Sequence, residues 1–284
     1  QFLTDKIDIV VATVAFGMGI NKSNVRYVVH HDVPRSIESY YQETGRAGRD
    51  GLESEALLLF DEKDAARVKQ WISQGELEDR NQIELQKFAA MEAFSEAQTC
   101  RRQVLLNYFS QFSDSACGNC DICLDPPKMI DGTVISQKVL SCVLRLQQQA
   151  ATQYVIDVLR GKQLKRLQEA GHHQLSTYGI GKDKSDSYWH NIINQLIHKG
   201  LIRVDITANA ALRLTEAARP VLKGEIAIQL ATPRLEFKPD KKAKQAPSNY
   251  DRTLFMRLKH LRKVLAEENE VPPYVVFSDA TLVD

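Results

Sequence analysis

Three of the five cysteines fall in one short polar loop with a fourth upstream, and their spacing is the strongest constraint on how this chain can fold. Cys117, Cys120 and Cys123 are separated by two residues each, and Cys100 lies upstream of them. Two-residue spacers let neighbouring thiolates converge on one ion, and the glycine and asparagine in the first spacer tolerate a left-handed backbone. Four sulfurs at about 2.3 Å in a tetrahedron suit a structural zinc with no open coordination position. The spacing therefore predicts a small module stabilised by zinc.

Two other interpretations of the cysteines are less favourable. A ferredoxin-type iron–sulfur run needs a fourth cysteine three residues further on, followed by proline, but residues 124–127 are Leu-Asp-Pro-Pro. Reduced core thiols do not suit a loop rich in Gly, Asn and Asp. Cys142 stands apart on the apolar side of an expected helix and is interpreted as a packed residue. An odd number of cysteines without a signal peptide argues for a reducing compartment.

The net charge of +1 conceals an uneven distribution. Residues 1–127 contain 13 Lys+Arg and 20 Asp+Glu (−7), residues 128–249 contain 19 and 10 (+9), and residues 250–284 contain 5 and 6 (−1). Positive charge concentrated in the middle segment predicts a module that binds a polyanion. No apolar run approaches the ~20 residues of a membrane helix. The first residues lack a secretory signal and a starting Met, so we expect a piece of a longer protein.

The first 61 residues have the pattern of an α/β fold. Residues 7–13, 25–30 and 55–60 are rich in β-branched residues or leucine and predict buried strands. Ser36 is a suitable N-cap for a helix between the last two strands, and Gly45 ends that helix. Strands separated by helices indicate a parallel sheet. We expect the first strands of this sheet to precede the chain.

The remaining segments are mainly helical. Helices are predicted at residues 64–72, 80–97, 101–109, 134–146, 155–159, 164–169, 185–199 and 250–268. Residues 201–206 and 211–214 follow as a hairpin, and three helices followed by a hairpin is the order of a winged helix. Residues 232–249 combine three prolines with four lysines and predict a flexible linker.

A glycine-bracketed pair of arginines is the main candidate for chemistry. Residues 40–51 read Tyr-Tyr-Gln-Glu-Thr-Gly-Arg-Ala-Gly-Arg-Asp-Gly and contain Arg46 and Arg49. The planar guanidinium fork matches phosphate oxygens, and the glycines allow close approach of the backbone to a ligand. A pair of arginines alone would be weak evidence, because most such pairs are solvated surface.

The complete string is more specific, because Gln-x-x-Gly-Arg-x-Gly-Arg resembles the last conserved motif of the superfamily 2 helicases. Residues 8–22 (Asp-Ile-Val-Val-Ala-Thr-Val-Ala-Phe-Gly-Met-Gly-Ile-Asn-Lys) resemble the motif before it. Together the two stretches are similar to the RecQ family, which carries a four-cysteine zinc module of this order and spacing after its motor. The resemblance covers nearly the whole chain.

The resemblance implies ATP-dependent 3′-to-5′ DNA unwinding in repair and recombination, including the SOS response, in the cytoplasm and nucleoid of a bacterium. It assigns Arg49 as an arginine finger, Arg46 to a phosphate contact and Gln42 to the nucleotide or its attacking water. Gly19 and Asn21 would contact the nucleotide, although Asn21 stands where related helicases often have Asp. Thr13 and Gly17 would hold DNA backbone.

Two motifs that the resemblance leads us to expect in a complete motor are absent from this segment. The sequence contains no Walker A lysine and no Asp-Glu-x-His box. ATP and Mg²⁺ would therefore bind in the full-length parent, and we expect this segment to be inactive alone.

The basic middle segment contains a second candidate site. Residues 178–185 (Tyr-Gly-Ile-Gly-Lys-Asp-Lys-Ser) lead into a helix capped by Ser185, and Lys182, Lys184 and the helix N–H groups could contact DNA phosphates. Asn191 lies on the expected polar face of that helix and is a further DNA candidate. The alternative is a glycine-rich turn with solvated side chains.

A third basic group comprises Arg145, Arg219 and Lys223. Bacterial members of the RecQ family dock the acidic tail of single-strand DNA-binding protein on the winged helix, so these residues are candidates for that contact.

The expected fold is α/β plus α+β. The expected parts are a partial RecA-like lobe (1–61), a helical zinc module (62–127), a winged helix (128–231), a linker (232–249) and the start of a helical HRDC-type domain (250–284). A non-catalytic zinc and winged-helix DNA-binding protein is the alternative, and the two motor motifs argue against it. A purely structural scaffold is disfavoured by the charge segregation.

Overall fold

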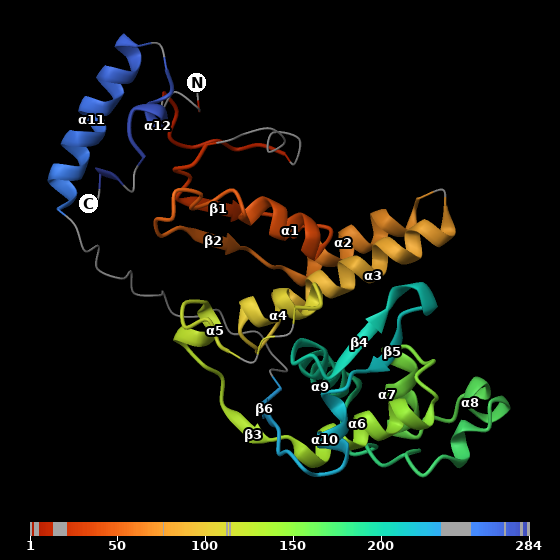
Figure 1. The fold of residues 1–284 in the computed structure, drawn as a ribbon. Coiled ribbons are helices and arrows are strands. Elements are labelled where there is room, and N and C mark those ends of the chain that lie inside the picture. Colours follow the sequence, from red (N-terminus) through yellow and green to blue (C-terminus); the bar gives the residue numbers. More distant parts are fainter. Residues whose placement is uncertain are drawn as a thin grey trace. The chain divides into compact units, whose positions relative to one another are not determined.

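Two compact units make up the chain, Gly75–Lys242 and the remainder, Gln1–Gln74 with Ala243–Asp284. Figure 1 shows their helices and strands. The computed structural model describes residues 2, 6–13, 22–75, 77–111, 113, 115–233, 251–269, 271–278 and 281–282. Within these residues, no helix combines the length and the apolar character required to cross a bilayer.

A parallel pair of strands forms the centre of the first unit. Strands β1 (Tyr27–His30) and β2 (Glu55–Leu58) pair in parallel, with Tyr27 opposite Glu55. Helix α1 (Ile37–Thr44) connects them, and α2 (Glu62–Ser73) follows. The Ser36 Oγ accepts a hydrogen bond from Ser39 N at 3.2 Å, which caps α1 as predicted. The parallel pairing and the connecting helix are thus confirmed.

Two parts of the strand prediction are wrong. Residues 7–13 form no strand, and Ile9 and Val11 are 80% and 96% exposed. Both observed strands are also largely open, with Tyr27 at 64% and Leu57 at 46% exposure. Strands of a parallel sheet are buried only where neighbouring strands and helices cover them. The described residues of the first unit supply only two strands, so the apolar side chains stay at the surface.

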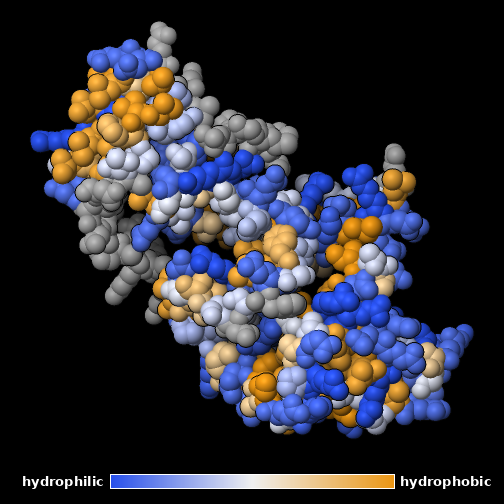
Figure 2. Space-filling model, in the orientation of Figure 1, coloured by the Kyte–Doolittle hydropathy of each residue, from blue (hydrophilic) through white to orange (hydrophobic). Residues whose placement is uncertain are grey.

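The last described residues form α11 (Arg252–Glu268) and α12 (Pro273–Val276). Asp251 caps α11 by accepting from Thr253 N at 2.8 Å. Several apolar side chains of α11 are exposed, among them Leu254 at 54% and Met256 at 62%. Orange, hydrophobic surface is visible over this helix in Figure 2. The predicted helix is therefore confirmed, although its apolar side chains are only partly covered.

The second unit begins with a helical region around the cysteines, called here the cysteine region (residues 77–124). Its helices are α3 (Glu78–Ser95), α4 (Arg101–Tyr108) and α5 (Asp121–Leu124). Phe88, Met91 and Phe94 of α3 are buried, as the helical pattern predicts. Ile83, in the first half of the same helix, is 44% exposed. The buried stripe of α3 is therefore confined to its C-terminal half.

The winged-helix region (residues 128–233) completes the second unit. Its elements are β3 (Met129–Asp131), α6 (Thr133–Arg145), α7 (Thr152–Arg160), α8 (Lys165–Glu169), η2 (His172–Gln174), α9 (Asp186–His198), β4 (Ile202–Asp205), η3 (Ile206–Ala208), β5 (Ala211–Leu214), α10 (Ala218–Leu222) and β6 (Gln229–Ala231). Its core joins side chains from all the long helices and the hairpin, among them Leu140, Ile156, Trp189, Ile193 and Leu212, each at most 1% exposed.

The winged-helix region contains two antiparallel pairs of strands. The predicted hairpin is confirmed, with Ile202 of β4 opposite Leu214 of β5. The second pair was not predicted and joins β3 to β6, with Met129 opposite Ala231. This pair brings the start and the end of the winged-helix region together. Residues 234–250, which contain most of the predicted linker, lie outside the described residues.

Candidate metal centre and nucleic-acid interface

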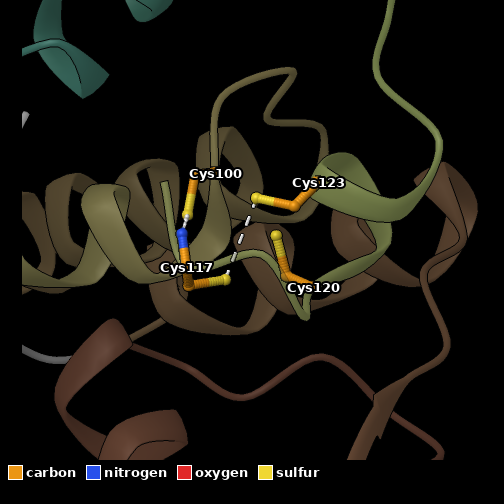
Figure 3. A group of neighbouring side chains, drawn as sticks. All are labelled: Cys100, Cys117, Cys120 and Cys123. Carbon is orange, nitrogen blue, oxygen red and sulfur yellow. Dashed lines mark hydrogen bonds between the residues drawn. The ribbon is translucent and has the colours of Figure 1, made fainter. Parts of the chain in front are cut away.

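Four cysteine side chains converge where α4 and α5 begin (Figure 3). The Sγ atoms of Cys100, Cys117, Cys120 and Cys123 all lie within 4.8 Å of one another, and those of Cys117 and Cys123 are 3.9 Å apart. A tetrahedron with Zn–S bonds of ~2.3 Å has sulfurs roughly 3.8 Å apart. The donor set and its spacing therefore fit a structural zinc ion, and the four residues brought together are the predicted ones.

Backbone groups assist this cluster. Cys117 N donates to Cys100 Sγ at 3.3 Å, and Arg101 N donates to Cys120 Sγ at 3.4 Å. Burial raises the pKa of the Cys120 thiol to about 12. Burial also opposes ionisation of Cys117, but hydrogen bonds from the Asn119 backbone and from Cys100 outweigh it and lower the pKa to about 7. A bound divalent ion would deprotonate the remaining thiols, because metal coordination favours the thiolate.

Arg101 connects the cluster to the surrounding helices. Its Nε and Nη2 donate to the two carboxylate oxygens of Asp121 at 3.0 and 2.8 Å, and its Nη1 donates to Ser95 O at 3.1 Å. Burial opposes ionisation of Asp121, but these hydrogen bonds with Arg101 keep its carboxyl pKa below the usual value. One side chain therefore joins the start of α4, the start of α5 and the end of α3 around the metal position. Such supporting bonds orient metal ligands.

Side-chain amides link the cysteine region to α9, and we call this contact the amide seam. Asn191 Nδ2 donates to Gln98 Oε1 at 3.2 Å, and Gln98 Nε2 donates to Thr232 O at 3.0 Å. Gln195 Nε2 donates to Asn191 Oδ1 at 2.7 Å. Asn107 Nδ2 donates to the carbonyl oxygen of His198 at 2.6 Å. The residues just before Cys100 thus contact both α9 and the segment that follows β6.

The amide seam corrects the predicted orientation of α9. Gln195 lies one turn after Asn191 on the same face, yet it is 2% exposed and exchanges two hydrogen bonds with Ala231. The Asn191 carboxamide is engaged at both ends, so a DNA contact would have to replace a bond within the protein. Trp189 is buried on the opposite side of α9 and donates from Nε1 to Gly181 O at 2.9 Å. Amides can be buried wherever partners satisfy them, which a helical pattern does not reveal.

The predicted basic turn leads into α9 as expected. Ser185 Oγ accepts from Tyr188 N at 3.1 Å, so Ser185 is the N-cap. Lys182 and Lys184 are exposed, and Lys184 Nζ lies 5.3 Å from the Tyr188 ring centroid and 3.6 Å from Asp183. The two lysines are therefore accessible to a ligand, whereas the Ser185 hydroxyl is already engaged in capping α9.

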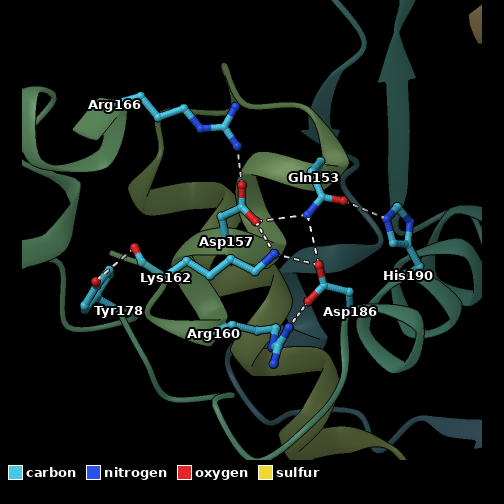
Figure 4. A network of polar contacts seen from close by, with 8 residues as sticks. All are labelled: Gln153, Asp157, Arg160, Lys162, Arg166, Tyr178, Asp186 and His190. Carbon is cyan, nitrogen blue, oxygen red and sulfur yellow. Dashed lines mark hydrogen bonds and ion pairs between the residues drawn. The ribbon is translucent and has the colours of Figure 1, made fainter. Parts of the chain in front are cut away.

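An ion-pair network near the start of α9 was not predicted (Figure 4). Lys162 Nζ lies 2.9 Å from the Asp157 carboxylate and 2.6 Å from that of Asp186, and Asp186 also pairs with Arg160. Arg166 pairs with Asp157 as well. Hydrogen bonds with Lys162 and then Arg160, opposed by burial, lower the pKa of Asp186 to about 2. A carboxylate therefore already occupies the first turn of α9, where the helix dipole favours negative charge.

The turn with the two arginines follows α1. Gly48, with φ of 64°, donates from N to Val25 O at 2.9 Å, which places the turn beside the amino-terminal ends of β1 and β2. Arg49 is exposed, and its Nε donates to Gly45 O at 3.3 Å. Arg46 is half-buried, and its Nε has no hydrogen-bond partner in the part of the chain that the structure describes. Gln42 is exposed as well.

The other predicted site residues are located as follows. Thr13 is exposed and belongs to no strand or helix, while Gly17, Gly19 and Asn21 lie outside the described residues. The three basic residues predicted to contact single-strand DNA-binding protein, Arg145, Arg219 and Lys223, are all exposed. Lys223 Nζ lies 3.4 Å from the Glu225 carboxylate.

Comparison with known proteins identifies four consecutive regions. The family models that match are the Helicase conserved C-terminal domain (residues 1–51), RecQ zinc-binding (62–124), the RQC domain (126–238) and the HRDC domain (251–284).

Curated relatives agree with these matches. An ATP-dependent DNA helicase RecQ from Haemophilus influenzae is 51% identical over 99% of the chain and 46% of the relative. The protein of the same name from Bacillus subtilis is 40% identical over 99% of the chain and 46% of the relative. The RecQ-like DNA helicase blm-1 from Caenorhabditis elegans is 33% identical over 79% of the chain and 25% of the relative. The chain spans just under half the length of the bacterial relatives. It belongs to the RecQ family and carries the zinc-binding, RQC and HRDC regions of that family.

Proposed function

We propose that the chain is the C-terminal portion of an ATP-dependent DNA helicase that unwinds DNA in the 3′-to-5′ direction. The observation that carries this proposal is the order of the four matched regions, together with a four-cysteine cluster built at the expected positions. In this proposal the parts are residues 1–61, 62–127, 128–231, 232–249 and 250–284, as expected above. The protein would act in the cytoplasm, in DNA repair and recombination.

The arginine turn would complete a nucleotide site whose remaining residues belong to the parent protein. Arg49 would stabilise the charge that develops on the transferring phosphoryl group, since its guanidinium is exposed and permanently charged. Arg46 would contact phosphate, and Gln42 would orient the nucleotide or the attacking water. Gly19 and Asn21 would add nucleotide contacts. ATP and Mg²⁺ would be bound mainly by the other half of the cleft.

The winged-helix region would bind DNA mainly through the phosphate backbone. Residues 128–249 carry the charge surplus of +9, and Lys182 and Lys184 are exposed beside the start of α9. The backbone of Ser185 and the side chain of Asn191 would complete this contact, together with Thr13 and Gly17 in the motor. Neutralised phosphates release counterions, so binding should weaken steeply with salt.

A protein partner would use a different set of cations in the same region. Arg145, Arg219 and Lys223 are exposed and would accept the acidic tail of single-strand DNA-binding protein.

Strand-separation assays on the full-length protein test this proposal. We expect unwinding of a duplex with a 3′ single-stranded tail, in the presence of ATP and Mg²⁺, and little unwinding with a 5′ tail. The chain of residues 1–284 alone should bind the same DNA without turning over ATP. DNA binding by both proteins with no ATP turnover by either would instead favour a non-catalytic zinc and winged-helix DNA-binding protein.

A further inference from the structure

A cleft of about 450 Å³ opens in the winged-helix region, lined by none of the lysines beside α9. It lies between the α6–α7 loop, the start of α7, the α8–η2 segment and the tip of the β4–β5 hairpin. Its walls and rim include Gln147, Gln149, Tyr154, Arg166, His172 and Asn209. We propose that this cleft receives one unpaired nucleobase from DNA that lies along the hairpin; the inference rests on the proposed DNA-binding function.

One wall of the cleft consists of flat groups. The Tyr154 hydroxyl and His172 Nδ1 are 2.6 Å apart, and the two rings meet edge to face with centroids 5.6 Å apart. The Arg166 guanidinium carbon lies 5.4 Å from the Tyr154 ring centroid. Aromatic rings and guanidinium planes are the surfaces on which proteins stack unpaired bases.

The rim offers groups that match the edge of a base. Among the described residues, the side-chain amides of Gln147, Gln149 and Asn209 have no hydrogen-bond partner, and all three residues are exposed. A carboxamide both donates and accepts, which is the pattern that base edges present. Gln147 and Asn209 adopt φ of 54° and 51°, a conformation that is costly for a residue with a side chain. The hairpin tip and the α6–α7 loop therefore hold amides at the mouth of the cleft.

Charge selects among the ligands that such a cleft could take. Arg166, the one permanently charged residue among those lining it, pairs with the Asp157 carboxylate, which is 2% exposed. The surplus positive charge that a phosphate or an acidic peptide would require is therefore absent from these walls. A neutral, planar ligand with donors and acceptors on its edge suits these walls better than a phosphate or an acidic peptide. Such a ligand is also small enough to enter a cleft of about 450 Å³. A nucleobase has these properties.

The test uses the 284-residue chain and a fluorescent forked DNA whose first unpaired nucleotide carries either adenine or an abasic site. We expect the abasic fork to bind ~5- to 10-fold more weakly than the adenine fork, in the range expected for removing one stacked base. The double variant Gln149→Ala/Asn209→Gly should show a smaller preference for the adenine fork, because the rim amides are removed while the planar wall of Tyr154 and Arg166 remains; glycine keeps the positive φ of position 209. Gln82→Ala, at an exposed amide of α3, is the matched control and should retain the preference.

The outcomes separate the two proposals. Equal binding of both forks by the unmodified chain, with normal binding of duplex DNA, overturns the base-receiving cleft alone. Failure to bind any DNA overturns the proposed function as well. Binding of a fluorescent acidic peptide that is weakened by Gln149→Ala/Asn209→Gly, without any preference between forks, would show that the cleft takes a peptide and contradict the proposal. Bound zinc and circular dichroism confirm that each variant is folded.

Discussion

Asn191 of α9 donates a hydrogen bond of 3.2 Å to Gln98, two residues before the first cysteine of the metal site. This bond joins the helix that begins at the basic turn to the cysteine region. Because Gln98 also bonds Thr232 O, and Gln195 bonds Asn191, a single chain of amides connects three separate stretches of sequence. Polar contacts therefore join the segment just before the metal site to the winged-helix region.

Breaking the amide seam should lower stability. Asn191→Ala leaves Gln98 Oε1 and Gln195 Nε2 without this partner, which costs about 1–2 kcal/mol of unfolding free energy. Urea denaturation of the chain measures the change. Asn194→Ala, on the same helix and outside the seam, should stay within about 0.5 kcal/mol of the unmodified chain. Equal destabilisation in the two variants would mean that the seam contributes nothing specific.

Zinc should be required for the fold of the cysteine region. A structural four-thiolate site contributes apparent energies of ~10–16 kcal/mol, which a region with so few buried apolar residues needs. We expect one zinc per chain, measured with a metal-sensitive dye after thiol release, and reduced amide-exchange protection in α4 and α5 on chelation. Cys120→Ser should lose the metal, whereas Cys142→Ala, at a cysteine buried in the winged-helix core, should keep it. Full zinc binding by Cys120→Ser would contradict the assigned ligand set.

Asp186 should make the winged-helix region sensitive to acid. Its pKa falls from 3.8 to about 2 through hydrogen bonds with Lys162 and Arg160. A lowered folded-state pKa stabilises the protein at pH values above the unfolded pKa, and that contribution is lost as the pH falls from about 4 to 2. Denaturation at a series of pH values should therefore show the difference between the unmodified chain and Asp186→Asn shrinking across this window. Asp183→Asn, at the exposed neighbour, is the control, and a difference that stays constant with pH would argue against the ion pairs.

The basic turn should contribute to the salt dependence of DNA binding. Removal of one lysine–phosphate interaction should reduce the slope of log K against log salt by roughly 0.9 for duplex DNA. Lys182→Ala/Lys184→Ala should thus show a shallower slope, by up to about 2, in titrations between low and moderate salt. Lys165→Ala removes an exposed lysine of α8 that pairs with Glu169 at 3.5 Å and should leave the slope unchanged. An unaltered slope in the double variant would exclude these lysines as phosphate ligands.

Local signals in the sequence were reliable where the chemistry is local. Ser36 and Ser185 cap the helices that they were predicted to cap, since an N-cap involves only residues within one turn. The cysteine spacing similarly specified the metal site, because two-residue spacers confine the sulfurs to one neighbourhood.

Contacts between distant segments could not be predicted in this way. The burial of Gln195 depends on Ala231, and the β3–β6 pair depends on residues that are about a hundred positions apart. Residues 7–13 have the composition of a strand, yet they form none without neighbours to pair with. The Asp157–Lys162–Asp186 network likewise depends on how α7 meets α9, which no spacing along the chain reveals.

We propose that Arg49 serves ATP hydrolysis in the full-length protein. The measurement is DNA-stimulated ATP turnover by the full-length protein carrying Arg49→Ala, with the exposed Arg35→Ala as the matched control. We predict that Arg49→Ala lowers turnover ~10³- to 10⁵-fold, as expected for an arginine finger, with zinc content and DNA affinity preserved and Arg35→Ala near normal. Turnover by Arg49→Ala within a few-fold of the unmodified protein would show that Arg49 is not an arginine finger.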